Sequence, residues 1–166
     1  MQLFTKSTIF LIFIVMSTLN ILNANAADYP MAPDWQLKTQ AGKTISLNDY
    51  KGKPVILHFW ATWCPYCKKL QPKLVELQEK YKDSGVEIVA ISFNEDEGTL
   101  PQDEIEARGY HFITAVNGEP AVQLYGVRGT PTTFFINRQG KAVYKSNSSD
   151  ITNPQLELAV QEIIKL

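Results

Sequence analysis

The chain has 166 residues, an apolar fraction of 45% and a formal net charge of −1 at pH 7. This length and apolar content suit one domain with a substantial hydrophobic core. The near-neutral charge gives no electrostatic basis for binding nucleic acid or an anionic membrane surface, so we expect no nucleic-acid partner.

Residues 1–26 have the pattern of an export signal. Lys6 precedes the apolar run Ile9–Met16, and Ala24-Asn25-Ala26 matches an A-x-A cleavage site. The run is short for a membrane span. We expect cleavage after Ala26 and a periplasmic or secreted protein, with an uncleaved membrane anchor as the alternative. The mature domain would then comprise residues 27–166.

The mature chain is predicted to begin with a β-hairpin. Alternating residues in Trp35–Lys38 and a turn over 40–43 precede a second short strand at Thr44–Ile45. The apolar, β-favouring run Val55–Trp60 then predicts a buried strand. We expect the hairpin to be scaffold without catalytic residues.

Cys64 and Cys67 follow this strand, three residues apart, at the start of a helical pattern. Their spacing allows a small disulfide ring across one helical turn. Unpaired N–H groups and the dipole at a helix N-terminus stabilise a thiolate. We therefore expect Cys64, nearer the solvent-facing helix start, to be the nucleophile and Cys67, one turn deeper, to be the resolving thiol.

Two other interpretations of this cysteine pair are less favoured. A structural zinc site needs four ligands, and His58 and His111, the remaining candidates, lie far apart in the sequence without ligand spacing. A purely structural disulfide would close so short a loop that it would constrain the unfolded chain little. Disulfide exchange in an oxidising compartment is the favoured interpretation.

The chain beyond the cysteines alternates helical and strand patterns. An apolar stripe predicts a core-packed helix that ends at Ser84-Gly85, and Val86–Ser92 predicts a buried strand parallel to the first. The acidic segment 94–98 is either a solvated loop, which we expect, or part of the cysteine site. The stripe consists of Leu70, Leu74, Leu77 and Tyr81.

The C-terminal half contains further short elements. Helical patterns at 101–108 and 120–125 flank a strand pattern at 112–116, and Thr130-Pro131 precedes a strand. A turn at 137–141, an edge strand at 142–145 and a final helix beginning at Asn153-Pro154 complete the domain.

The segment Trp60-Ala-Thr-Trp63-Cys64-Pro-Tyr-Cys67 resembles the active-site segment of the thioredoxin superfamily. From about Pro33 to Leu166 the chain is similar to periplasmic thioredoxin-like proteins of the TlpA and ResA type, which include the cytochrome c maturation branch. The resemblance implies an α/β thioredoxin fold: a central mixed β-sheet flanked by helices, with the N-terminal β-hairpin and a small TlpA-like insertion. It covers most of the chain and is specific for fold and reaction class.

The resemblance also implies roles for residues outside the cysteine pair. The family places a cis-proline opposite the C-x-x-C motif, and Pro131 matches it, so Thr130-Pro131 is expected to be cis. The Thr130 backbone would then be free to pair with an extended substrate segment. Trp63 would shield one side of the disulfide. No cofactor and no metal are expected.

Two positions depart from the family pattern. Thioredoxins have a buried Asp six residues before the first cysteine, where this chain has His58. ResA-like proteins often have a Glu three residues after the second cysteine, where this chain has Leu70. His58 is either a proton relay with a pKa lowered by burial or, as we expect, a neutral, hydrogen-bonded core residue.

Together these features predict an exported thiol-disulfide oxidoreductase. The favoured function is a reductase of cysteine-containing periplasmic proteins, such as apocytochrome c before haem attachment, supplied by a membrane thiol-disulfide electron donor. The alternatives are a disulfide oxidase or isomerase of secreted proteins, and a cysteine-bearing binding module.

Overall fold

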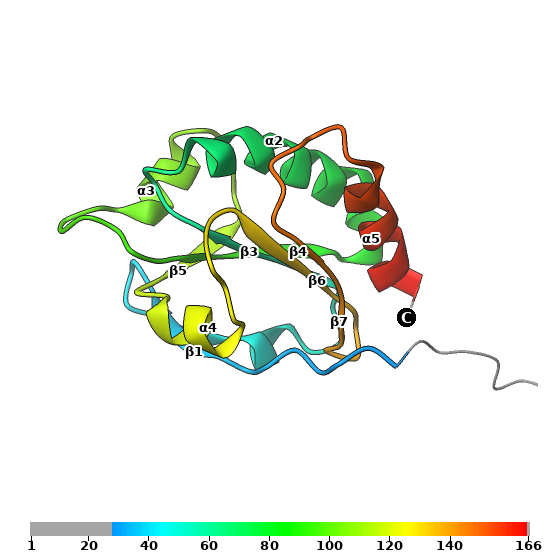
Figure 1. Cartoon of the computed structure of the whole chain (residues 1–166). Helices are drawn as coiled ribbons and strands as arrows, with labels where there is room; N and C mark the ends of the chain where they lie inside the picture. Colours follow the sequence, from blue (N-terminus) through cyan, green and yellow to red (C-terminus); the bar gives the residue numbers. More distant parts are fainter. Residues whose placement is uncertain (1–27, 166) are drawn as a thin grey trace, which may run out of the picture.

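A mixed β-sheet with helices on both faces organises the computed structural model, which describes residues 28–165 (Figure 1). The strands are β1 (Gln36–Thr39), β2 (Thr44–Ser46), β3 (Val55–Trp60), β4 (Glu87–Ser92), β5 (Ile113–Val116), β6 (Thr132–Ile136) and β7 (Ala142–Ser146). The helices are α2 (Pro65–Lys80), α3 (Pro101–Glu106), α4 (Glu119–Leu124) and α5 (Pro154–Lys165), with short 3-10 turns η1 (Leu47–Tyr50) and η2 (Lys82–Ser84).

The seven strands lie in the order β2-β1-β5-β4-β3-β6-β7. The β3/β4 and β4/β5 pairs are parallel, and the other neighbouring strands are antiparallel. Parallel strands need a long crossover connection, which α2 supplies between β3 and β4. The predicted thioredoxin-like α/β fold with a mixed central sheet is confirmed.

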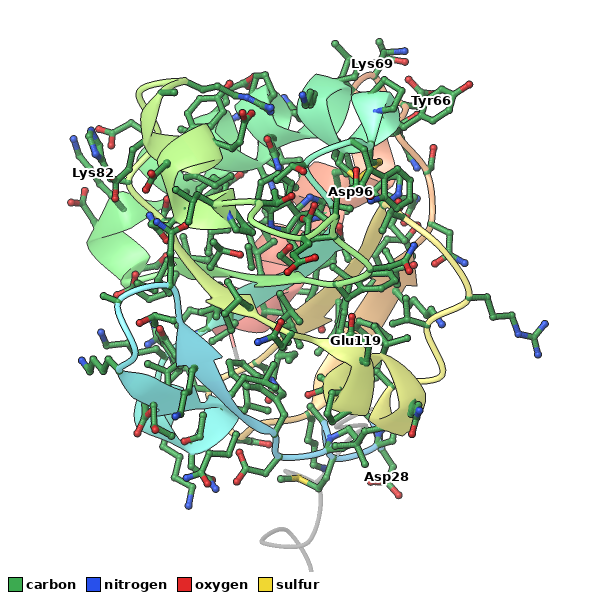
Figure 2. All side chains as sticks on the ribbon, turned by 90° about the vertical axis from the view of Figure 1, so that its left-hand side faces the viewer. Asp28, Tyr66, Lys69, Lys82, Asp96 and Glu119 are labelled. Atoms are coloured by element: carbon green, nitrogen blue, oxygen red, sulfur yellow. A yellow bond between two sulfur atoms is a disulfide. The ribbon has the colours of Figure 1, made fainter. Side chains whose placement is uncertain are left out.

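The first turn of α2 lies at one end of the molecule. Figure 2 shows Tyr66 and Lys69 of this helix at the upper edge and Asp28, where the described chain begins, at the lower edge. Among residues 28–165, no helix is long and apolar enough to cross a membrane. The predicted export signal and the cleavage after Ala26 lie outside the described residues.

Every residue of strand β3 is buried, which shows that this strand lies at the centre of the core. Since side chains alternate between the faces of a sheet, Ile56 and Trp60 pack on the α2 side, whereas Leu57 and Phe59 pack on the opposite side. A strand covered on both faces is expected to be continuously apolar, which accounts for the sequence pattern.

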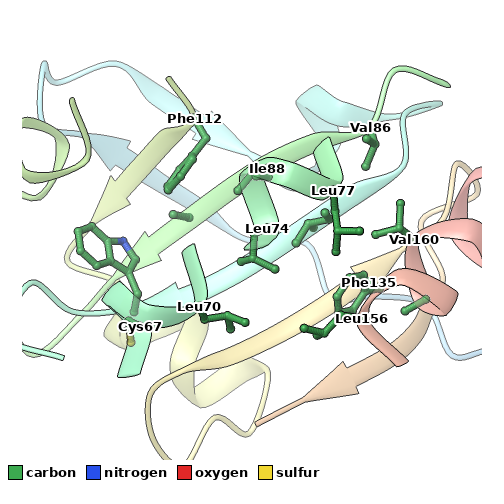
Figure 3. Close-up of a cluster of buried hydrophobic side chains, with 14 of the residues drawn as sticks. Cys67, Leu70, Leu74, Leu77, Val86, Ile88, Phe112, Phe135, Leu156 and Val160 are labelled. Carbon is green, nitrogen blue, oxygen red and sulfur yellow. The ribbon is translucent and has the colours of Figure 1, made fainter. Parts of the chain in front are cut away.

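The apolar stripe of α2 packs on the sheet as predicted. Leu70, Leu74 and Leu77 are fully buried, and Figure 3 shows them facing the sheet together with Phe135 of β6 and Leu156 of α5. The helix begins with Pro65, where a missing N–H is not needed, and Gly85 ends the following turn in a left-handed conformation with φ of 70°. This packing fixes the start of α2 against the end of β3.

The predicted elements correspond to observed ones throughout the described chain. The N-terminal hairpin forms as β1 and β2, and the 101–125 segment forms α3, β5 and α4. Strand β7 is an edge strand, and α5 begins at Pro154. Boundaries differ from the predictions by a few residues at most, as at α3, which ends at Glu106 rather than Arg108.

Candidate active site

Cys64 and Cys67 form a disulfide where β3 gives way to α2. Their Cα atoms are 5.4 Å apart, which agrees with the predicted ring across one helical turn. Cys64 is 2% exposed and Cys67 is 0% exposed, whereas Trp63 and Tyr66 are 50% and 62% exposed. The exposed Trp63 and Tyr66 agree with a solvent-facing helix start, but both cysteines of the disulfide are buried in the core cluster under α2.

The backbone of α2 directs a hydrogen bond to Cys64. The Cys67 N–H donates to Cys64 Sγ at 3.1 Å, in the position of an N-cap interaction. After reduction, the same N–H and the positive end of the helix dipole would stabilise a Cys64 thiolate. This geometry agrees with the expected nucleophilic role of Cys64.

His58 lies on β3, on the sheet face covered by α2, and is completely buried. Its Nδ1 is 3.0 Å from Thr133 Oγ1, and its Nε2 has no hydrogen-bond partner among residues 28–165. Burial lowers the pKa of His58 to about 3, because the charged imidazolium would be desolvated. The ring is therefore neutral at physiological pH, as the core interpretation expects.

The loop after β4 contacts the cysteine segment through Glu95, as the alternative to a solvated loop predicts. The Thr62 N–H donates to Glu95 Oε1 at 2.8 Å, and Thr62 Oγ1 donates to Glu95 Oε2 at 2.6 Å. Ser92 Oγ also donates to Glu95, and Trp63 Nε1 donates to the Asn94 carbonyl at 2.8 Å. These bonds tie the loop to the segment immediately before Cys64.

The solvated-loop expectation for residues 94–98 is thus wrong for Glu95 and correct for the exposed Asp96 and Glu97. The parallel register of β3 and β4 explains the difference. Trp60 pairs with Ser92, so the residues that follow the two strands emerge side by side. Glu95 follows β4 and Thr62 follows β3, so a carboxylate and a threonine in these positions could have indicated the contact from the sequence.

Thr130 and Pro131 lie at the same edge of the sheet as the cysteines. Thr132 in β6 pairs with Phe59 in β3, so the start of β6 is opposite the end of β3. The Thr130-Pro131 peptide bond is cis, as predicted. Pro131 is buried and Thr130 is partly exposed.

The residues expected to form the site therefore come together from three elements. The end of β3 and the start of α2 supply the cysteine segment, and Pro131 immediately precedes β6. Leu70, at the position where ResA-like proteins often carry Glu, is fully buried in the apolar cluster. The Leu70 side chain can neither accept nor release a proton. Of the two positions that depart from the family pattern, only His58 therefore carries a titratable side chain.

Comparisons with known proteins identify the same chemistry. Residues 30–145 match the AhpC/TSA family. The thiol-disulfide oxidoreductase ResA of Bacillus anthracis is 38% identical over 133 residues, covering 80% of this chain and 76% of the relative. ResA of Bacillus subtilis (strain 168) is 35% identical over 149 residues, covering 86% and 83%.

Two solved structures have similar folds. The thioredoxin domain of a thiol-disulfide oxidoreductase from Bacteroides vulgatus has a TM-score of 0.69 and 26% identity, covering 82% of this chain and 99% of that chain. A thiol:disulfide interchange protein from Bacteroides sp. also has a TM-score of 0.69 and 26% identity, covering 84% of this chain and 91% of that chain.

Proposed function

The chain belongs to the AhpC/TSA family and is a thiol-disulfide oxidoreductase, and we propose that it acts outside the cytoplasm as a reductase of protein disulfides. The observation that carries this proposal is the Cys64–Cys67 disulfide at the N-terminus of α2, with the Cys67 N–H directed at Cys64 Sγ. The helix start favours thiolate on the first cysteine, and the second lies within reach to close the ring.

The proposed reaction begins with the reduced protein. The Cys64 thiolate attacks one sulfur of a substrate disulfide, forms a Cys64–substrate mixed disulfide and expels the other substrate sulfur as a thiolate. The Cys67 thiol then loses its proton and attacks Cys64 Sγ, which re-forms the Cys64–Cys67 disulfide and releases the second substrate thiolate. The protein gives up two electrons, which the substrate gains as two thiolates. Conversion of these to two thiols takes up the proton released by Cys67 and one proton from water.

The residues around the disulfide would position the substrate. We assign to the Thr130 backbone the pairing with an extended substrate segment, in the manner of strand addition. Trp63, held by its hydrogen bond to Asn94, would cover one side of the disulfide. Since Trp63 and Tyr66 are the exposed aromatic residues of the motif, they would form the first contact surface for a substrate protein.

The proposed substrates are exported proteins with paired cysteines, such as apocytochrome c before haem attachment. The resemblance to the TlpA and ResA type supports this class, and export by the expected signal would bring the protein into the same compartment as these substrates. Continued turnover would require a membrane thiol-disulfide donor that returns two electrons to Cys64–Cys67. An oxidase or isomerase of secreted proteins would use the same residues with electrons flowing in a different direction.

Trapping tests the exchange reaction directly. In a Cys67→Ala variant the second step cannot occur, so we expect mixed disulfides between Cys64 and substrate proteins to accumulate in the periplasm. The matched Cys64→Ala variant should trap far less, because the Cys67 N–H at the helix start points at Cys64 Sγ and so favours a thiolate on Cys64. If the single Cys67→Ala variant traps nothing and a double cysteine variant still binds partners undiminished, the protein is a binding module instead.

A further inference from the structure

A polar pocket of about 410 Å³ lies directly beside Thr130 and Pro131. The loop between α4 and β6 forms one wall, and Lys145 and Asn147 at the end of β7 form the other. Figure 1 shows this loop and the end of β7 at the same end of the sheet. Arg128 and Lys145 are the charged side chains that line the pocket, and both are cationic.

These two cations are available to a ligand. Within residues 28–165, neither Arg128 nor Lys145 has an ion-pair partner, and both side chains are exposed. Lys145 Nζ lies over the Phe134 ring, 5.1 Å from its centroid. A cation–π contact holds an ammonium in place without neutralising it.

The other side of the cysteine segment has the opposite charge. In the strand order β4-β3-β6, the loop after β4 and the loop before β6 flank the end of β3 on opposite sides. The groove at the β4 loop is lined by Glu95, Asp96, Glu97 and Glu119. A substrate segment at Cys64 would therefore meet cations on one side and carboxylates on the other.

We propose that the pocket beside Thr130 binds an acidic side chain, Asp or Glu, close in sequence to the reacting cysteine of the substrate polypeptide. This inference rests on the proposed function, because that function brings an extended segment to the Thr130 backbone. Side chains of an extended segment alternate in direction, so a residue near the cysteine can enter the pocket while the cysteine meets Cys64. The guanidinium of Arg128 and the ammonium of Lys145 can both donate charge-assisted hydrogen bonds to this carboxylate.

Charged peptide probes test the proposal. Each synthetic peptide carries one cysteine in a mixed disulfide with 2-mercaptoethanol, a neutral thiol, and one Glu, Gln or Lys placed in turn on either side of that cysteine. The reduced protein becomes the Cys64–Cys67 disulfide as it releases the peptide thiol and 2-mercaptoethanol. The measured quantity is the second-order rate constant at low and high ionic strength.

For at least one placement, we expect the Glu peptide to react about two- to fivefold faster than the Gln peptide at low salt, as exposed charge pairs allow. The Lys peptide should react more slowly than the Gln peptide, and 1 M salt should reduce both differences. In an Arg128→Gln/Lys145→Gln variant, the Glu-to-Gln rate ratio should fall toward one. Lys38→Gln, which removes an exposed cation from β1 on the far side of the sheet, should keep the ratio.

The outcomes separate this inference from the proposed function. Equal rates for all peptides, in a protein that still reduces the disulfide of 2-mercaptoethanol, would overturn the pocket assignment alone. A Glu preference that survives in the Arg128→Gln/Lys145→Gln variant would also overturn it. Failure to reduce either the peptides or the disulfide of 2-mercaptoethanol would overturn the proposed function and this inference with it.

Discussion

At the residue scale, His58 shows how position determines the state of an ionisable side chain. The ring replaces a family carboxylate directly below the redox helix, and burial keeps it neutral with a pKa of about 3. A carboxylate at this position would accept a proton near neutral pH if burial raised its pKa, whereas His58 resists protonation. His58 therefore contributes packing and a hydrogen-bond contact between its Nδ1 and Thr133 Oγ1.

His58 should make the folded state sensitive to acid. Because its folded pKa of about 3 lies below the unfolded value near 6.5, the unfolded chain binds more protons between these two values. The stabilisation is complete above pH 6.5 and is lost as pH falls toward 3. We expect His58 to account for about 2 kcal/mol of lost unfolding free energy between pH 7 and pH 5.

Urea denaturation across this pH range measures the effect. A His58→Gln variant should lose stability less steeply on acidification than the parent protein, whatever its stability at pH 7. His111→Gln, which replaces the other, exposed histidine, should retain the parent slope. Equal slopes for His58→Gln and the parent would show that His58 is not held neutral by burial.

At the element scale, the loop after β4 determines the geometry of the cysteine segment. Glu95 accepts hydrogen bonds from Thr62 and Ser92, and Asn94 accepts one from Trp63. The segment between β3 and α2 is therefore held from the side as well as by its own helix. This arrangement explains how a short irregular segment keeps Cys64 in a fixed position.

Glu95→Gln should loosen this attachment. Gln has one carbonyl oxygen in place of two carboxylate oxygens, so at least one donor of Thr62 or Ser92 would meet an NH₂ group. We expect a loss of about 1–2 kcal/mol in unfolding free energy, measured by urea denaturation. Glu97→Gln, in the exposed part of the same loop, should change stability by less than about 0.5 kcal/mol. Similar values for both variants would contradict a positioning role for Glu95.

The secondary structure was largely predictable because it depends on local patterns. The apolar run of β3, the stripe of Leu70, Leu74 and Leu77, and the glycine after α2 each act within a few residues. The contact between Thr62 and Glu95 was not predictable in this way, because it depends on the register of two strands separated by a whole helix. The burial of Cys64 likewise depends on tertiary packing around the disulfide.

At the scale of the whole molecule, the redox site lies at one end and the described chain begins at the other. Asp28 and the first turn of α2 occupy opposite edges in Figure 2. A chain held at its N-terminus, by an anchor or during export, would therefore present Cys64 and Thr130 away from the point of attachment. This orientation would leave the cysteine segment accessible to large substrate proteins.

Export with cleavage is a further expectation for the whole chain. In a bacterial host that recognises the signal, we expect the periplasmic form to begin at Ala27, as measured by intact mass and N-terminal sequencing. An Ala26→Asp substitution should block cleavage, because the A-x-A site requires a small residue. A membrane-bound product that retains residues 1–26 would favour the uncleaved anchor.

The reduction potential of the Cys64–Cys67 pair tests the central claim most directly. The protein would be equilibrated with thiol buffers of known potential, and the reduced fraction would be measured for this two-electron couple. A reductase predicts a value near that of thioredoxin, about −270 mV. A value near about −120 mV would contradict the reductase assignment and identify the protein as a disulfide donor.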